Sequence, residues 1–340
     1  MVAANDHDGV PDVVCIGSAA LDLLLRVDEL PGADGRVPAD AGMMAGGGPA
    51  ATAAVALARL GARVELIARV GDDLPGRIIR EQLVAEGVGV RWLVEGGEGS
   101  RSAVSSGVLR TGPPATRSLV ALSAWPALNV ADLPADAIGA CHAARWLHVD
   151  HAGWPLVAGL RSEGVRTLVS VDGGNPLAGL DPSLVDLYVP SITEVRRWTG
   201  EADPDIAIGR PLGAGARVVI ATKGEDGARY LGRLDPDEAW PADGGTPMLD
   251  AEASPWRLEL PACPVEVIST LGAGDVYHGA LLAALLQGVT IREAMLEAAV
   301  AAALSCRALD GRSAIPDRPT LEAALDAWSP APALAWRSDA

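Results

Sequence analysis

The residues with the clearest chemical potential are Gly272, Ala273, Gly274 and Asp275, which precede an apolar helical pattern over 276–286. A glycine-rich turn that opens a helix leaves backbone N–H groups free at the positive end of the helix dipole, where a phosphate can bind. A carboxylate there would repel a resting phosphate, so Asp275 is better suited to take a proton from a hydroxyl that attacks a phosphoryl group. A plain helix N-cap is the alternative, because Asp caps well and Gly suits turns. This turn alone leaves both interpretations open.

A second cluster of small residues, Gly-Gly-Gly-Pro-Ala-Ala-Thr at 46–52, opens a helical pattern that ends before Gly61. It formally matches the dinucleotide fingerprint Gly-x-Gly-x-x-Ala, but that fingerprint directly follows the first strand, and the strand predicted at 13–17 lies about thirty residues upstream. Small residues also let a polyhydroxylated substrate or its phosphate approach the backbone, while tight helix packing explains them equally well. An NAD-binding oxidoreductase is therefore the least favoured hypothesis.

Three further candidates follow predicted strands. Thr222, Gly224 and Gly227 form a turn after one strand, and ligands bind at the carboxyl ends of strands in open α/β sheets; a simple hairpin is the alternative. Glu194 falls in the first turn of a helix, where it could approach Mg²⁺ and its waters or only favour the helix dipole. Asp22 follows the first strand and could bind two sugar hydroxyls or lie at the surface.

Strand-like and helix-like segments alternate along the chain, which predicts a mainly parallel sheet covered by helices. Two segments, 18–42 and 94–124, carry only short β-like runs and predict a small sheet that covers the main domain as a lid. Residues 232–257 are rich in Pro, Gly and Asp and predict an exposed insertion or hairpin. The predicted strands are 13–17, 64–70, 145–149, 167–171, 187–189 and 218–221, and the clearest helices are 49–60 and 76–86.

Composition excludes several classes of function. The chain has 340 residues and a formal charge of −17, which disfavours nucleic acid and anionic membrane surfaces as partners. Its four cysteines are scattered without a Cys-x-x-Cys pair, so they predict no zinc site. The first twelve residues are polar and acidic and do not resemble a signal peptide, and the longest apolar run, near 279–286, is too short to span a bilayer. We therefore expect a cytoplasmic protein.

Taken in order, these motifs resemble the ribokinase/PfkB family of carbohydrate and nucleoside kinases. The resemblance covers about residues 12–318, and the Gly-Ala-Gly-Asp turn is its most specific element. The motifs, in chain order, are Gly17 to Asp22, Gly47-Gly48-Pro-Ala-Ala-Thr52, Ser191-x-x-Glu194, Thr222-x-Gly224-x-x-Gly227, Gly272-Ala-Gly-Asp275 and the Ala-rich segment 298–316.

The resemblance implies one doubly wound α/β domain with a small β-sheet lid. We place this domain over 12–328 and expect flexible tails at 1–11 and 329–340. It implies ATP as phosphoryl donor, Mg²⁺ as counter-charge, a small-molecule sugar as acceptor, and leaves open a monovalent cation and a homodimer formed through the lid. Asp275 would be the general base, and the N–H groups of Gly272, Ala273 and Gly274 the anion hole. The remaining implied contacts are Thr222, Gly224, Gly227, Ala299 and Ala303 on the nucleotide side; Asp22, Gly47, Gly48, Thr52 and Arg101 on the acceptor side; and Glu194 near the metal.

Three departures from the family pattern affect the substrate first and the metal second. Ser269 stands where the family usually has Asp, and Thr52 and Ser191 stand where it usually has Asn. A hydroxyl lacks the paired donor and acceptor of an amide. The main hypothesis is an ATP-dependent kinase of a sugar or sugar phosphate; a nucleoside kinase and a non-catalytic nucleotide or sugar sensor are the alternatives. The lid arginines Arg36, Arg101, Arg110 and Arg117 could bind a phosphorylated acceptor or be solvated surface charges.

Overall fold

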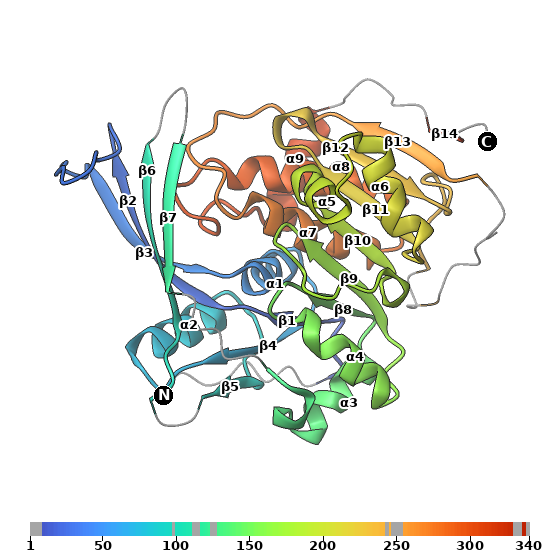
Figure 1. Ribbon diagram of the computed structural model, residues 1–340, viewed down its shortest axis with the longest axis horizontal. Helices are drawn as coiled ribbons and strands as arrows, with labels where there is room; N and C mark the ends of the chain where they lie inside the picture. Colours follow the sequence, from blue (N-terminus) through green and yellow to red (C-terminus); the bar gives the residue numbers. More distant parts are fainter. Residues whose placement is uncertain are drawn as a thin grey trace.

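The computed structural model describes residues 9–96, 99–110, 116–122, 128–241, 245, 254–328 and 335–337. Within these ranges the chain forms a large layered body and a separate small sheet that stands apart from it (Figure 1). The two parts are joined where the first strand of the body, β1 (Val13–Gly17), runs into the first strand of the small sheet, β2 (Ala20–Val27).

The body is built on a ten-stranded sheet in the order β14-β13-β12-β11-β10-β9-β8-β1-β4-β5. Pairing is parallel from β5 to β11 and antiparallel from β11 to β14, so the predicted mainly parallel sheet is confirmed. Besides β1, its strands are β4 (Val64–Val70), β5 (Leu93–Glu95), β8 (Trp146–Val149), β9 (Leu168–Gly173), β10 (Leu187–Pro190), β11 (Val218–Thr222), β12 (Ala228–Gly232), β13 (Trp256–Leu260) and β14 (Trp336–Arg337).

Helices cover both faces of this sheet, which gives the doubly wound arrangement (Figure 1). Alternate residues of β1 show why, because Val13 and Cys15 enter one apolar cluster while Val14 and Ile16 enter the other. The first cluster includes α1 (Pro49–Arg59), α2 (Leu74–Ala85), α7 (Ala273–Leu285), α8 (Ile291–Ser305) and α9 (Arg318–Ala327). The second includes α3 (Ala135–Ala143), α4 (Trp154–Ser162), α5 (Ile192–Thr199) and α6 (Pro204–Gly213).

The small sheet has the order β3-β2-β6-β7 and corresponds to the predicted lid. Its remaining strands are β3 (Ala41–Gly47), β6 (Ala103–Arg110) and β7 (Thr116–Leu122). We expected the first lid segment to end near residue 42, but β3 continues to Gly47 and leads directly into α1. The glycines at the end of β3 have no side chain to continue a β pattern, so the sequence hid this extension. Part of the predicted 232–257 insertion lies outside the described residues, and β12 and β13 flank it as an antiparallel pair.

Candidate active site

Asp150 anchors the carboxyl edge of the sheet, where β1 and β8 end beside the start of α1. Its carboxylate accepts hydrogen bonds from the Ser18 N–H at 2.8 Å, the Ala50 N–H at 3.2 Å and the Ala152 N–H at 2.8 Å. The side chain is completely buried. A buried carboxylate needs such donors, and these come from three separate segments, so Asp150 holds the strand ends and the helix start together.

The backbone N–H groups at the start of α1 already donate hydrogen bonds within the protein. Gly48 is its N-cap at φ +91°, and a Cβ there would lie 2.5 Å from the Ser18 carbonyl oxygen. The Ala51 N–H donates to that same carbonyl at 3.1 Å, while the Ala50 N–H donates to Asp150. Because these N–H groups are already bonded, the turn at 46–52 does not offer the free donors that a dinucleotide pyrophosphate would use.

The turn before α7 keeps its donors free. Gly272 is the N-cap at φ +75°, and a Cβ there would lie 2.8 Å from Gly311 Cα, so only glycine fits without strain. The first described helical bond runs from the Val276 N–H to the Gly272 carbonyl at 2.9 Å, and the Ala273 N–H has a long contact of 3.4 Å with the Thr270 carbonyl. The N–H groups of Gly272, Gly274 and Asp275 donate to no other described group. This helix start can therefore bind an anion.

Asp275 lies at this start and is half-buried. Burial raises the pKa of the Asp275 carboxyl well above its usual range, and the carboxylates of Asp172 and Asp150 raise it further. The Arg312 guanidinium opposes this rise. A carboxylate with a raised pKa is a stronger base, which suits proton transfer near neutral pH.

Asp172 and His278 form a buried pair beside Asp275. Asp172 is the second-last residue of β9, and His278 lies on α7 almost one turn after Asp275. Burial would raise the pKa of Asp172, but His278 and the Gly174 N–H lower it to about 2. The ring of His148 stacks obliquely on that of His278 at 5.3 Å between centroids, and burial together with His278 lowers the pKa of His148 to about 3. The Asp172 carboxylate therefore lies close enough to Asp275 to raise the pKa of that group.

The predicted acceptor-side residues meet at the base of the lid. The Ser105 hydroxyl donates to Asp22 Oδ1 at 2.6 Å, and a Cβ on Gly47 would lie 2.2 Å from Asp22 Oδ2. Burial raises the pKa of Asp22, whereas Ser105 and Arg312 lower it. Arg312 Nη2 donates to the Gly47 carbonyl at 2.8 Å and Nε donates to Thr52 Oγ1 at 3.2 Å. The structure therefore brings Asp22, Gly47 and Thr52 together around a guanidinium that we did not predict.

The lid arginines differ in what they contact. Arg117 on β7 donates from Nη1 to Thr270 Oγ1 at 2.7 Å and so links the lid to the segment before the α7 turn. Arg110 donates to a backbone carbonyl within the lid. Arg101 is exposed and acts on the carboxylate of Asp73 at the start of α2, and Arg36 is exposed. Of the four, Arg117 alone makes a described hydrogen bond to the body of the protein at this site.

The predicted nucleotide-side turn follows β11. Thr222 ends that strand and lies 3.5 Å from the Pro190 carbonyl oxygen through its hydroxyl. Gly227 has φ +86°, and a Cβ there would lie 2.0 Å from the Leu260 carbonyl oxygen. Gly224 has φ +60° with open space around it. The turn between β11 and β12 is therefore a loop whose conformation depends on two glycines with positive φ, and it is longer than a two-residue hairpin turn.

The predicted adenine-side helix, α8, ends beside the anion turn. Ala299 and Ala303 lie one turn apart on α8 and are half-buried. The Cys306 carbonyl, just past the helix, accepts hydrogen bonds from the N–H groups of Ile268 and Ser269 at 2.8 and 3.1 Å. These bonds tie the end of α8 to the segment that enters α7.

Glu194 stands at the start of α5. Its N–H donates to the hydroxyl of the N-cap residue Ser191 at 3.1 Å, and its carboxylate lies 3.7 Å from Arg197. Among the described residues, no three His, Cys, Asp or Glu side chains gather as a ready cation site. A single carboxylate nevertheless fits Mg²⁺, which usually keeps several waters and is held largely by substrate phosphates.

Residues 10–118 and 176–318 match the family model for the pfkB family of carbohydrate kinases. This chain belongs to that family. The kinase is 26% identical over 319 residues to a ribokinase of Bacillus subtilis (strain 168), covering 92% of this chain and 99% of that protein. Two solved structures share its fold. Arabidopsis thaliana ribokinase complexed with ribose and ATP has a TM-score of 0.72 and 20% identity, and the match covers 93% of this chain and 99% of that chain. A putative E. coli ribokinase II in complex with ATP and Mg²⁺ has a TM-score of 0.71 and 20% identity, and the match covers 94% of this chain and 100% of that chain. The predicted family and ribokinase-like fold are confirmed.

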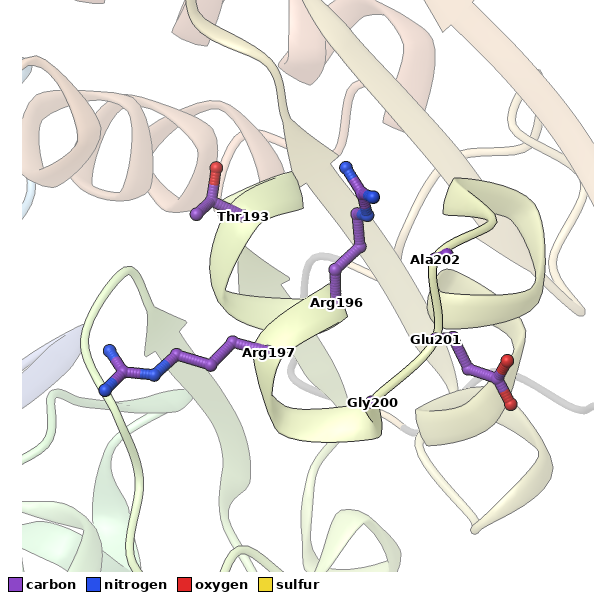
Figure 2. Close-up of a pocket in the computed structure, with 6 residues that line it drawn as sticks. All are labelled: Thr193, Arg196, Arg197, Gly200, Glu201 and Ala202. Atoms are coloured by element: carbon purple, nitrogen blue, oxygen red, sulfur yellow. The ribbon is translucent and has the colours of Figure 1, made fainter.

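A surface hollow on the kinase lies beside Glu194, since its lining includes the neighbouring residue Thr193 and the ion-pair partner Arg197. It has a volume of about 350 Å³ and is open to solvent, and Figure 2 shows the side chains of α5 and of the turn after it around its rim. Its lining residues are Thr193, Arg196, Arg197, Gly200, Glu201 and Ala202. Within the described residues, every helix falls short of the length and apolar character needed to cross a membrane.

The sequence missed Asp150, Asp172, His278 and Arg312. Asp150 directly follows β8, and Asp172 follows the apolar run 168–171 near the end of β9, and these positions could have singled them out. His278 follows Asp275 at helical spacing. Arg312 gave no signal at all, because its partners are distant in the chain.

Proposed function

We propose that this kinase transfers the γ-phosphoryl group of ATP to a hydroxyl of a sugar or a related small carbohydrate, with Asp275 as general base. The observation that carries the proposal is a carboxylate of raised pKa beside the free N–H groups of Gly272 and Gly274. In this reaction the acceptor O–H proton passes to Asp275 as the acceptor oxygen bonds to phosphorus, and the bond to the β-phosphate oxygen breaks to release ADP.

The anion hole in this proposal is formed by Gly272, Ala273 and Gly274. The free N–H groups of Gly272 and Gly274, the N–H of Ala273 with its long contact to Thr270, and the α7 dipole would stabilise charge on the transferring group. Fixed dipoles need no reorganisation during the reaction. Mg²⁺, when bound, would offset phosphate charge, and Glu194 would hold one of its ligands or waters. The nucleotide side would consist of Thr222, Gly224, Gly227, Ala299 and Ala303.

The acceptor side would be formed by Asp22, Gly47, Gly48 and Thr52. Asp22 is held by Ser105 against the Gly47 backbone, which suits a carboxylate that accepts two sugar hydroxyls. Arg101 lies two residues before β6, which carries Ser105, and would join this side near the strand end where Ala103 pairs with Ala20. The family includes sugar and nucleoside kinases, so a sugar, a sugar phosphate and a nucleoside are the acceptors to compare. ATP as donor agrees with the predicted cytoplasmic location.

Asp275→Asn tests the assignment of the base. We expect kcat to fall by about 10²- to 10⁴-fold, the usual contribution of a positioned general base, while ATP affinity stays near the wild-type value. Coupled-enzyme assays of ADP release and calorimetry of ATP binding measure the two quantities. Unchanged turnover in this variant would rule out Asp275 as the base.

The alternative of a non-catalytic sensor rests on Ser269, Thr52 and Ser191. Each of these hydroxyls has a local role: Ser269 accepts from the Leu271 N–H, Ser191 caps α5, and Thr52 accepts from Arg312. A panel of sugars, sugar phosphates and nucleosides, assayed for ATP consumption, separates the two functions. Turnover with any acceptor ends the sensor hypothesis.

Repeating the panel with K⁺ exchanged for tetramethylammonium tests whether activity depends on a monovalent cation.

The proposed homodimer would use the outer face of the lid. Met44, Leu23, Ser106 and Val120 lie in one row across its four strands, and the three apolar members are 59%, 43% and 74% exposed, respectively. Such an apolar row on a solvent-facing sheet favours association with a second copy. Sedimentation of the wild type and of Val120→Asp tests this, and a wild-type protein that stays monomeric at micromolar concentration contradicts it.

A further inference from the structure

Arg312 is a buried cation in the segment that follows α8, and it is 5% exposed. Its own segment is fixed locally, because Asp310 accepts hydrogen bonds from the N–H groups of Arg312 and Ser313 at 3.2 and 3.1 Å. The neighbouring Gly311 packs on the anion turn, with its Cα 2.8 Å from where a Cβ on Gly272 would lie. The backbone of this segment therefore touches the turn that carries Asp275.

The Arg312 side chain reaches in the other direction, to the acceptor side. Two of its three nitrogens donate to the Gly47 carbonyl and to Thr52 Oγ1. The third, Nη1, lies against the Gly46 backbone, where a Cβ would come within 1.9 Å of it. A planar guanidinium with two fixed hydrogen bonds has little freedom, so it positions both groups that it contacts.

The charges around Arg312 are carboxylates from several elements. Burial lowers the pKa of Arg312 to about 10, and Asp22, Glu86, Asp275 and Asp310 act in the opposite direction. The guanidinium therefore stays charged at neutral pH. Burying a cation is costly unless nearby anions compensate, and here Asp22 and Asp275 belong to the proposed reaction site.

We propose that Arg312 is a positioning residue of the kinase reaction, which fixes Gly47 and Thr52 on the acceptor side and balances the negative charge of Asp22 and Asp275. This inference rests on the proposed function, in which those two carboxylates flank the acceptor hydroxyl. It also gives the Thr52 hydroxyl a role, because this hydroxyl accepts a hydrogen bond from Arg312, which lies 260 positions later in the chain.

Charged groups from several elements set the pKa of Asp275. Asp22 comes from β2, Asp150 from the end of β8 and Asp172 from β9, while His278 on α7 pairs with Asp172. Arg312 is the cation that lowers the pKa of Asp275 against these carboxylates. Without it, Asp275 would hold its proton to higher pH and be less available as a base near neutral pH.

The decisive measurement is the titration of the Asp275 carboxyl by ¹³C NMR in the full-length protein, with Asp275→Asn identifying its signal. We expect the midpoint to rise by about one pH unit in Arg312→Met, the lower end of the effect of an opposite charge, and to stay near the wild-type value in Arg312→Lys. The acidic limb of the pH profile of kcat/KM should move by the same amount. Thr52→Val, which keeps the cation, should raise the KM of the acceptor without moving the midpoint.

Arg59→Met is the matched control, because Arg59 holds the same segment through the carbonyl oxygens of Arg312 and Ile315 at 2.9 and 2.8 Å. It should lower the urea midpoint without moving the Asp275 titration. If Arg312→Met does not fold, Gly46→Ala displaces the guanidinium instead and should raise the midpoint in the same direction. An unchanged Asp275 midpoint in the folded variant, or an equal shift in Arg59→Met, would overturn the inference. Absence of turnover with every acceptor contradicts the proposed function instead, and the NMR titration still decides the role of Arg312.

Discussion

The Nε2 atom of His278 lies 3.2 Å from Oδ1 of Asp172, and both side chains are buried at 4% exposure. This pair connects the end of β9 to the first turns of α7 and so fixes the helix that carries Asp275. Because the negative charge of Asp172 raises the pKa of Asp275, the pair also tunes the proposed base.

Asp172→Asn should shift the pH profile of kcat/KM toward lower pH. Removing a like charge near Asp275 lowers the pKa of that carboxyl, so the base becomes available at lower pH. Asp172 also contributes to stability, because its pKa is about 2 in the folded protein against an ordinary value of 3.8. That contribution, on the order of 2 kcal/mol, is present above pH ~4 and is lost as pH falls through ~2. Urea unfolding at several pH values measures it.

Asp186→Asn is the control for this variant. Asp186 is also buried, accepts from the Val169 N–H at 2.8 Å and pairs with Arg217 at 2.7 Å. It precedes β10, at the opposite end of the sheet strands from Asp172. The substitution should reduce stability and leave the pH profile in place. A profile that moves equally in both variants would show that the shift reflects general destabilisation.

Gly47→Ala should raise the KM of the acceptor by about tenfold or more, which corresponds to ~1.4 kcal/mol, while leaving the KM of ATP nearly unchanged. The new Cβ would lie 2.2 Å from Asp22 Oδ2, so the carboxylate must move away from the acceptor side. Gly139→Ala in α3 is the control, because no atom lies within 4 Å of a Cβ there. The control should be neutral or more stable by about 0.5–1 kcal/mol. Steady-state kinetics with each substrate varied in turn gives both KM values, and a change confined to ATP would contradict the assignment.

Gly272→Ala should lower kcat by about 10²-fold or more, the scale of losing one donor of an oxyanion hole. The residue has φ +75° and no room for a Cβ beside Gly311, so the substitution must displace the turn. Gly288→Ala is matched in backbone strain, since Gly288 has φ +76° after α7. Both variants should lose about 1 kcal/mol or more of stability, but only Gly272→Ala should lose kcat. Equal kinetic effects would contradict the anion-hole assignment.

Arg117→Ala should raise the ratio of wasted ATP hydrolysis to phosphoryl transfer. Its guanidinium donates to Thr270 Oγ1 at 2.7 Å, and loss of this bond weakens the hold of the lid over the site, where water must be excluded. Because the side chain is exposed, stability should change by less than about 0.5 kcal/mol. Parallel assays of ADP release and product formation give the ratio. Arg110→Ala, which removes another lid arginine, should keep the wild-type ratio, and an equal rise there would argue against a specific contact.

Local signals in the sequence were sufficient for the fold and for the turn before α7. The apolar run at 13–17 became β1 because both faces of a parallel sheet are buried, and 64–70 became β4 although Glu65 and Arg69 interrupt its apolar residues. Glycines next to an aspartate at the start of an apolar helix indicated the anion turn for the same local reason. The end of β3 escaped prediction because glycine carries no β pattern.

What the sequence by itself determined is therefore the class of fold, the order of its motifs and Asp275 as the candidate base. Only the tertiary structure decided which charges surround that base. Asp22, Asp150, Asp172 and Arg312 come from separate strands and loops, and their effect on Asp275 depends on distances that the packing of the sheet, the lid and the segment after α8 fixes. A pKa depends on burial and on charges nearby in space, and neither follows from spacing along the chain.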